Sequence, residues 1–267
     1  MSDLKKIFSH SGDFGDIIYS LATLKYLNAD TLTLFPSLKS RVILSKKIYE
    51  NIKELLLTQS YLKNINYSDE SFETPLNNFR YWMRWFSIPE SHIFAYGVHR
   101  PFALDFFNQS PWFTLPYVKQ EDKIVFCFTN RKKFNNHFNF NIPQTLAPDH
   151  NICFVGLEQD YEYFKLNSSY RFSDFIEAKS FLHLAEIIAS AKLVIGNPCG
   201  SIALAHAMHI PVISCENDGD KCCRFSYRRS LHIEDSYNER TLFYNFMSNN
   251  NLDIDVDKII ATLNNFA

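Results

Sequence analysis

Apolar and polar positions divide the first third of the chain into short apolar runs and longer segments with apolar residues at helical spacing. The short runs predict strands at residues 6–9, 31–35 and 62–67, and the longer segments predict helices at 15–27 and 45–57. Strands that alternate with helices favour a parallel sheet with helices on its faces. Residues 68–119 are less regular, and a candidate aromatic helix at 76–86 is followed there by segments that prolines interrupt.

A second alternation of strands and helices begins at residue 123. It predicts strands at 124–128 and 151–155, a helix at 158–166, and a block of helix, strand, turn, helix and strand over 185–214. Residues 238–248 and 255–266 are expected to form closing helices, the last of which could pack back onto the first half. We therefore expect an α/β protein with two Rossmann-like domains, residues 1–118 and 119–267, whose parallel sheets face a central cleft.

The turn at residues 196–201 is the most informative feature of the second half. It follows Leu193-Val194-Ile195, an apolar run typical of a strand that is covered on both faces. The next helix is expected to start near Gly200 and to direct its backbone N–H groups into the turn, where they would attract phosphate. The sequence thus predicts a site for a phosphorylated or nucleotide ligand, bound by the amides of Cys199, Gly200 and Ser201, with Asn197 fixing the turn.

The turn between the first strand and the first helix contains Gly12, Asp13, Gly15 and Asp16. Ligands of open α/β sheets bind at the carboxyl ends of strands, so this turn is expected to face the cleft. The glycines allow close backbone approach, and each aspartate can either cap the helix or act on a ligand. His10 is the histidine best placed for a site. The glycine spacing departs from G-x-G-x-x-G, the dinucleotide-binding fingerprint.

Basic and acidic side chains follow other predicted strands of the second half. Arg131, Lys132 and Lys133 come just after one strand, and the guanidinium of Arg131 suits phosphate. Gly156 flanks a second turn that is expected to face the cleft. Glu216 follows a third strand, where its carboxylate could accept a hydrogen bond from a ribose or sugar hydroxyl. For each of these side chains the alternative is a solvated surface loop.

Composition narrows the class of protein. The 267 residues are 46% hydrophobic and carry a net charge of -2, which gives no global field for nucleic acid or membranes. The sequence shows neither a signal-peptide core nor an apolar run long enough to span a bilayer. Its six cysteines lack C-x-x-C spacing. We expect reduced, buried thiols, a cytoplasmic location, and a site that uses neither a metal nor a cofactor.

Several segments of the chain form one combined pattern. They are Gly15-Asp16-Ile17-Ile18 at the first helix, Phe154-Val-Gly-Leu-Glu158, and the block over 185–214. Together they resemble the heptosyltransferase-like glycosyltransferases of GT-B fold. Residues 12–25, 130–131, 154–164 and 184–197 are similar to an uncharacterised phage and bacterial branch of that superfamily. The sequence departs from the family pattern at Pro198-Cys199-Gly200, where the family has Asp-Ser/Thr-Gly, and at Ala203, where it has His.

This resemblance implies an acceptor bound mainly by the first domain and a nucleotide-sugar bound mainly by the second. It also implies an inverting, metal-independent transfer in which Asp13 or Asp16 deprotonates the acceptor hydroxyl. We rank Asp13 ahead as the base and Asp16 as a cap or orienting group, with His10 as a further catalytic candidate. The expected acceptor contacts are Gly12, Phe14 and Gly15. The acceptor is either a surface glycan, such as lipopolysaccharide, or a hydroxymethylated base of phage-like DNA.

Two other functions stay open from the sequence. The departures at Pro198 and Ala203 favour a nucleotide-sugar-binding protein without catalysis, and a nucleotide-sugar epimerase uses a similar fold. The aromatic and basic segments at 80–86 and 221–229 either contribute to the core or bind a glycan, a lipid-linked acceptor or a nucleic acid. His206 and His209 are expected to serve packing.

Overall fold

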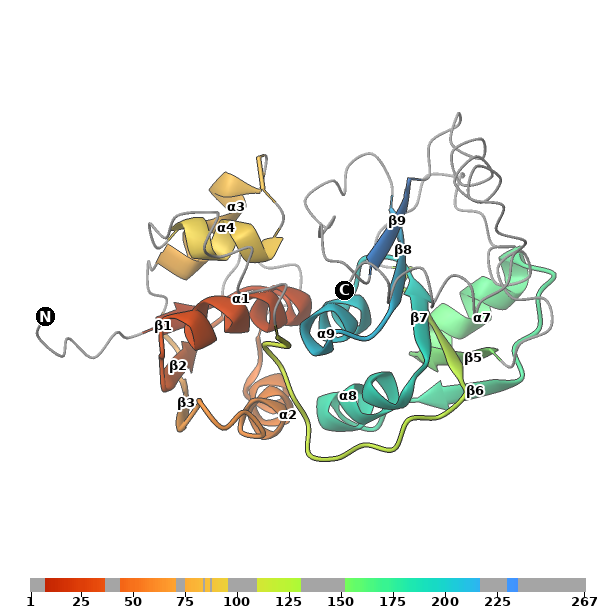
Figure 1. Cartoon of the computed structure of the whole chain (residues 1–267), viewed down its shortest axis with the longest axis horizontal. Helices are drawn as coiled ribbons and strands as arrows, with labels where there is room; N and C mark the ends of the chain where they lie inside the picture. The colour runs from red at the N-terminus through yellow and green to blue at the C-terminus, as the bar shows by residue number, and fades with distance from the viewer. Residues whose placement is uncertain are drawn as a thin grey trace, which may run out of the picture.

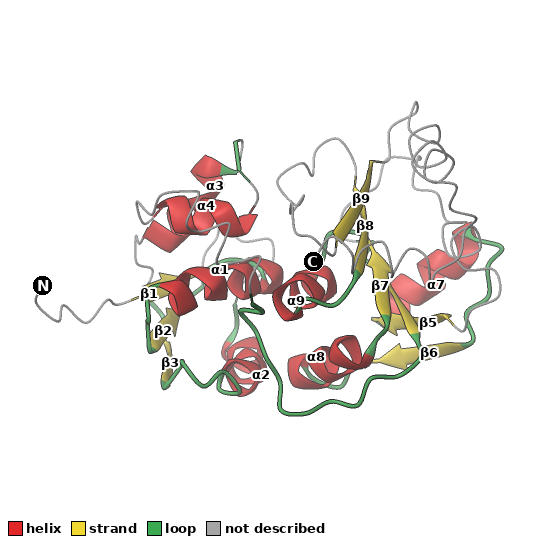
Figure 2. Ribbon diagram, in the orientation of Figure 1, coloured by secondary structure: helices red, strands yellow, loops and turns green. Residues whose placement is uncertain are grey.

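The computed structural model describes residues 8–36, 44–70, 75–83, 85–86, 88–95, 110–130, 152–216 and 230–234. The described strands form two separate sheets, one in each half of the chain, with helices packed against them (Figures 1 and 2). Every described strand pair is parallel. The predicted α/β class with parallel sheets is therefore confirmed, whereas the domain boundary at residues 118 and 119 stays a prediction.

The sheet of the first half contains β1 (Phe8–His10), β2 (Thr31–Leu34) and β3 (Asn64–Tyr67), in that order. Helices α1 (Phe14–Tyr26) and α2 (Lys46–Leu56) connect these strands, close to the predicted positions. Ser45 caps α2, because its hydroxyl accepts a hydrogen bond from the backbone N–H of Ile48 at 3.3 Å. Every residue of α1 from 17 to 24 is buried, because this helix packs against two other helices, α4 (Ile88–Ala95) and α9 (Gly200–Met208).

The aromatic segment after β3 differs from its prediction. A single helix was expected at 76–86, but the structure has a 3-10 turn, η1 (Pro75–Asn78), then a short helix, α3 (Phe79–Trp82), and a separate helix, α4 (Ile88–Ala95). Proline is tolerated in the first turn of a helix and disrupts its interior. Pro89 therefore favours a new helix that starts at Ile88, which the sequence analysis did not anticipate.

The sheet of the second half has the strand order β6-β5-β4-β7-β8-β9. Its strands are β4 (Ile124–Cys127), β5 (Ile152–Gly156), β6 (Asp174–Glu177), β7 (Leu193–Gly196), β8 (Val212–Glu216) and β9 (Ser230–Glu234). The connecting helices include α7 (Glu158–Asn167), α8 (Phe181–Ser190) and α9 (Gly200–Met208). This is the doubly wound order of a dinucleotide-binding fold, with its topological switch point between β4 and β7.

Two strands of this sheet were not predicted from the sequence. They are β6 and β9, which lie at its two edges. The side chains of β6 are exposed or half-buried, so the strand lacks the apolar run that marks the buried strands β4 and β7. The closing helices predicted at 238–248 and 255–266 lie outside the described residues.

The two halves meet along neighbouring helices, with α1 against α9 and α2 against α8 (Figure 1). The Tyr19 hydroxyl and His206 Nδ1 lie 2.8 Å apart across this interface. The fully buried Trp112 strengthens it, because its indole N–H donates to the carbonyl of Ile18 at 3.2 Å and its backbone N–H donates to the carbonyl of Ala207 at 3.1 Å. Within the described residues, none of the helices combines the length and apolar character that crossing a membrane requires.

Candidate active site

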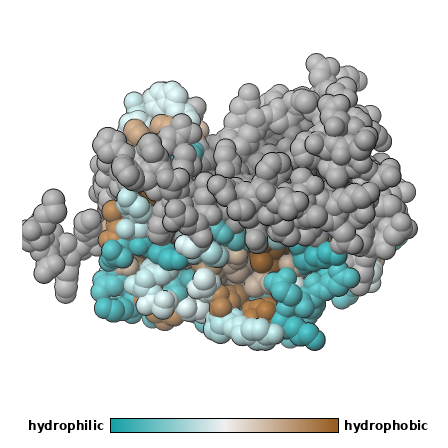
Figure 3. All heavy atoms as spheres, viewed as in Figure 1, coloured by the Kyte–Doolittle hydropathy of each residue, from teal (hydrophilic) through white to brown (hydrophobic). Residues whose placement is uncertain are grey.

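A cavity of about 500 Å³ lies between the two halves of the chain. The first turn and α2 line one side of it. The other side is formed by the carboxyl ends of β4 and β5 and by the starts of α7, α8 and α9, the last of which follows β7. Figure 3 shows apolar atoms gathered at the surface over α8, from which Phe181 and Leu184 line the cavity. The cavity therefore occupies the switch point of the larger sheet, where ligands of open α/β sheets bind.

The N-cap residues of four helices line this one cavity. They are Asp13 of α1, Leu157 of α7, Ser180 of α8 and Cys199 of α9. A helix N-terminus carries roughly half a positive elementary charge, because its first N–H groups have no intrahelical acceptor. The four helix starts therefore offer backbone N–H donors to an anion. Lys179 also lines the cavity, together with the carboxylates of Asp13 and Asp160.

The carboxyl ends of β4 and β7 are tied together by Asn197, whose side chain is fully buried. Its amide oxygen accepts a hydrogen bond from the backbone N–H of Thr129 at 3.0 Å, and its amide nitrogen donates to the carbonyl of Thr129 at 2.9 Å. Sequence reasoning placed Asn197 among the donor contacts. The structure shows it bracing the two strand ends that flank the switch point.

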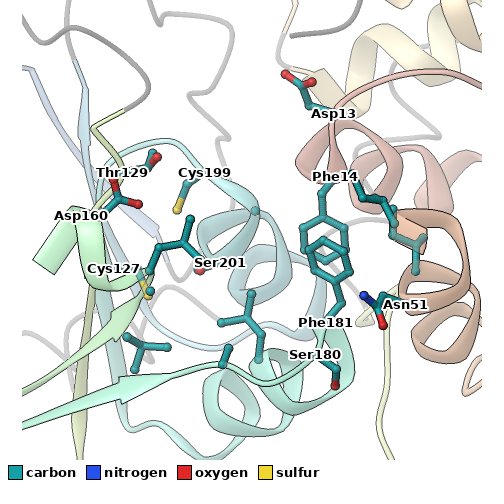
Figure 4. Close-up of a pocket in the computed structure, with 18 of the residues that line it drawn as sticks. Asp13, Phe14, Asn51, Cys127, Thr129, Asp160, Ser180, Phe181, Cys199 and Ser201 are labelled. Carbon is teal, nitrogen blue, oxygen red and sulfur yellow. The ribbon is translucent and has the colours of Figure 1, made fainter. Parts of the chain in front are cut away.

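The turn predicted to bind phosphate packs against the first turn. A Cβ atom on Gly200 would collide with the ring of Phe14, and one on Gly15 would lie 3.6 Å from the Cβ of Ala203. The ring of Phe14 stacks on Phe181, with centroids 4.1 Å apart. Close approach of the two halves thus requires glycine at position 200, and Phe14 joins the start of α1 to the start of α8 (Figure 4).

Cys199, Gly200 and Ser201 all line the cavity, and the binding of phosphate by their amides stays a prediction. Cys127, a buried residue at the end of β4, also lines the cavity. Burial raises the pKa of Cys127 well above its usual value, so this thiol is neutral at physiological pH.

His10 is fully buried beside the first turn in a chain of hydrogen bonds that fixes its tautomer. Its Nδ1 accepts from the backbone N–H of Gly12 at 2.8 Å, so the ring proton is on Nε2, which lies 3.0 Å from Nε2 of His92. Nε2 of His92 accepts this hydrogen bond from His10, and Nδ1 of His92 donates to the carbonyl of Ile88 at 2.9 Å. Burial, with a smaller contribution from the charge of Arg80, lowers the pKa of His10 to about 3.

The two aspartates of the first turn have different surroundings. Asp13 lines the cavity as the N-cap residue of α1. The side chain of Asp16 is 13% exposed, and its carboxylate forms a 2.7 Å ion pair with Arg80 of α3. Gly12 also lines the cavity, and a Cβ atom on it would collide with the His10 ring. The first turn is thus packed tightly around Gly12, with Asp13 at the cavity.

Asp160 is a candidate that sequence reasoning missed. It lies in the first turn of α7 and lines the cavity, although only 4% of the residue is exposed. One of its carboxylate oxygens accepts a hydrogen bond from the backbone N–H of Asn130 at 3.0 Å. Figure 4 shows Asp160 beside Thr129, across the cavity from Asp13. The sequence signal that could have identified Asp160 is its position four residues after Gly156, on a helix that follows a buried strand.

The remaining predicted residues are placed as follows. Gly156 lines the cavity at the end of β5. Glu216 is the last residue of β8, but its side chain lies outside the described part of the structure, as do Arg131, Lys132 and Lys133. Lys179 also lines the cavity and is not among the predicted site residues.

Comparisons with known proteins show the fold. No protein-family profile matches the sequence, and a search of the curated proteins finds no match to it. A glycosyl transferase family 9 protein from Veillonella parvula has a similar structure, with a TM-score of 0.61, 9% identity and 96% coverage of both chains. The Escherichia coli heptosyltransferase WaaC is similar in its ADP-bound form, with a TM-score of 0.56, and in its form with ADP-2-deoxy-2-fluoro heptose, with 0.53.

Both WaaC structures are 11% identical to this chain, and in each comparison 91% of this chain and 99% of WaaC are covered. The chain therefore has the α/β fold with parallel sheets of the heptosyltransferase-like GT-B proteins, which confirms the fold expected from the sequence. At these identities the similarity is one of fold.

Proposed function

We propose that the protein is a glycosyltransferase that moves a sugar from a nucleoside-diphosphate sugar to an acceptor hydroxyl. The observation that carries this proposal is the convergence of four helix N-caps on one cavity at the switch point, with Asp13 across from Asp160. The helix starts provide a site for a diphosphate, and the carboxylate of Asp13 can accept a proton. The glycosyltransferases of similar fold support the same proposed function.

In the proposed reaction Asp13 is the base. Its carboxylate takes the proton from the acceptor hydroxyl as that oxygen forms a bond to the anomeric carbon of the donor sugar. The bond between the anomeric carbon and the diphosphate oxygen breaks, and the nucleoside diphosphate leaves with the electron pair. A single displacement of this kind inverts the anomeric configuration. Asp16 is less suited to this role, because on taking a proton it would give up its ion pair with Arg80.

The second half of the chain would hold the donor. The backbone N–H groups at the starts of α8 and α9 would donate to the diphosphate oxygens, where negative charge develops as the leaving group departs. Lys179 would add a positive charge, together with Arg131 and Lys132 if these reach the site as the sequence predicts. Asp160 would accept hydrogen bonds from a hydroxyl of the donor. No metal or cofactor takes part in the proposed reaction.

Among the two acceptors considered, we propose a glycan. The net charge of -2 provides no general attraction to DNA, and the donor site described here is the same for either acceptor.

The test is nucleotide release from a panel of UDP-, ADP- and GDP-sugars, with the product analysed by mass spectrometry. We expect nucleoside diphosphate release with at least one donor. Asp13→Asn should reduce that release by at least a hundredfold, while Asp16→Asn should retain more of it. Ligand-induced stabilisation without turnover would instead identify a binding protein. A changed sugar with the nucleotide still attached would identify an epimerase.

A further inference from the structure

An exposed group of aromatic side chains lies outside the cavity, on and after α3. Tyr81 and Trp85 are 58% and 55% exposed. Their rings meet at a centroid distance of 5.7 Å, and each also contacts the ring of Trp82, at 5.0 Å and 5.9 Å. We refer to Tyr81, Trp82 and Trp85 as the α3 aromatic surface. Large exposed aromatic groups are uncommon on soluble domains and often mark a binding site.

The α3 aromatic surface rests on a packed base. Trp82 makes an edge contact with Phe94 of α4 at 4.6 Å, and Phe79 stacks on His92 of the same helix at 4.0 Å. The segment is also closed by backbone hydrogen bonds from the N–H groups of residues 85 and 86 to the carbonyl of Trp82. These contacts hold the exposed rings in place before any ligand arrives, which reduces the entropy lost on binding.

The same short helix reaches the first turn of the proposed active site. Arg80, the residue before Tyr81, forms the 2.7 Å ion pair with Asp16. A helix rises about 1.5 Å per residue, so Asp16 lies about 4.5 Å along α1 from Asp13. The α3 aromatic surface is therefore on the same side of the molecule's first half as the proposed base, but outside the cavity. A ligand that reached both would have to extend beyond a single sugar.

We propose that the α3 aromatic surface is a second carbohydrate site that binds a sugar unit of an oligosaccharide acceptor, away from the reacting hydroxyl. The proposal rests on the glycosyltransferase function above and names its acceptor class. The apolar C–H face of a pyranose packs on indole and phenol rings, while its hydroxyl groups remain in water or bond to polar groups at the ring edges. Tyr and Trp offer this combination of an apolar face and a polar edge.

A lipid surface is the competing partner, because Tyr and Trp also favour membrane interfaces. The observations favour the sugar. The described cation of this helix, Arg80, is engaged by Asp16 rather than presented alone to anionic headgroups. The exposed large apolar side chains described in this segment are Tyr81 and Trp85, whereas a helix that binds a membrane interface combines Trp with exposed Phe and Leu.

Tryptophan fluorescence reports on this surface directly. The chain has three tryptophans, of which Trp112 is fully buried at the interface of the two halves and the other two belong to the α3 aromatic surface. We expect a saturable blue shift when the whole protein is titrated with a core oligosaccharide released from lipopolysaccharide by mild acid, with chitohexaose and maltoheptaose as further probes.

The double variant Trp85→Ala with Tyr81→Ala should raise the dissociation constant of the responding oligosaccharide at least tenfold. This constant is measured by isothermal titration calorimetry, because the variant has lost one of the fluorescent tryptophans. Trp85→Phe should retain most of the affinity. Tyr117→Ala, which removes a 93% exposed aromatic side chain elsewhere, is the matched control and should leave binding unchanged. Hydrolysis of the donor, in which water takes the place of the acceptor hydroxyl, should release nucleotide at the same rate in all these variants. A failure of the transferase function is therefore distinguishable from a failure of this site.

Two results would overturn the proposal. One is the absence of any saturable response to the three oligosaccharides up to millimolar concentrations. The other is a response to vesicles of phosphatidylglycerol and phosphatidylethanolamine that the double variant abolishes while no oligosaccharide binds, which would assign the surface to a membrane.

Discussion

The buried His10–His92 pair makes a quantitative prediction about acid stability. Both rings are fully buried, and burial lowers the pKa of each, to about 3 for His10 and in the same direction for His92. In the unfolded chain a histidine takes up its proton near pH 6.5. The unfolded state therefore binds more protons than the folded state below pH 6.5, and the stability contributed by each neutral ring is lost as the pH falls from 6.5 towards 3.

The size of this effect follows from the shift. For His10 alone, lowering the pH from 7.5 to 5 should remove about 2 kcal/mol of the free energy of unfolding, with a limiting slope of about 1.4 kcal/mol per pH unit. His92 adds to the slope with the same sign. Urea denaturation at pH values between 7.5 and 5 measures the slope directly, in a range that lies above the titration of most carboxylates.

Replacing both rings, as His10→Gln with His92→Phe, should flatten that slope even though it lowers stability at pH 7.5. Phe79→Leu is the control: it removes the ring that stacks on His92 at 4.0 Å, so it should lower stability at every pH and keep the wild-type slope. A wild-type free energy of unfolding that is constant between pH 7.5 and 5 would refute the reasoning. So would a slope that the double replacement leaves unchanged.

Three further predictions concern the cavity. Asn197→Ala should destabilise the protein by about 2–4 kcal/mol in urea denaturation, because the backbone N–H and carbonyl of Thr129 would lose their partners in a buried environment; a loss below 1 kcal/mol would contradict the bracing role. Gly200→Ala should lower the melting temperature, since its Cβ atom would collide with Phe14, and adding Phe14→Ala should recover part of the loss. Asp160→Asn should weaken donor binding about tenfold in calorimetry, and its circular dichroism spectrum should remain that of the folded protein. A variant that binds the donor as tightly as the wild type would show that Asp160 is not part of the donor site.

Local sequence signals were sufficient for the framework of the fold. Buried strands such as β4 and β7 consist of continuous apolar residues, and the turns that follow β1 and β7 contain the glycines that their close packing requires. The same signals failed at the sheet edges, because β6 presents side chains that are exposed or half-buried. They also failed at 76–86, where the position of Pro89 rather than apolar periodicity decides where a helix begins.

The candidate site could be predicted only in part, for a physical reason. The two turns are local features, so Asp13 and the residues at 199–201 were found from sequence and do line the cavity. The partners of a side chain depend on contacts between distant segments. The pairing of Asp16 with Arg80 joins residues 64 positions apart, and the bonds from Asn197 to Thr129 join residues 68 apart. Their functional roles remain proposals.

The first turn shows how one segment can combine rigidity with a reactive group. His10 fixes its backbone by accepting the N–H of Gly12, and Asp16 fixes the start of α1 through Arg80. Arg80 of α3 pairs with Asp16, and His92 of α4 makes a hydrogen bond with His10. The helices that carry the α3 aromatic surface therefore also set the position of Asp13. An acceptor bound on that surface would therefore rest on the same elements that orient the proposed base. This arrangement would hold the reacting hydroxyl at a fixed position relative to the carboxylate of Asp13, because the same helices position both the aromatic surface and that carboxylate.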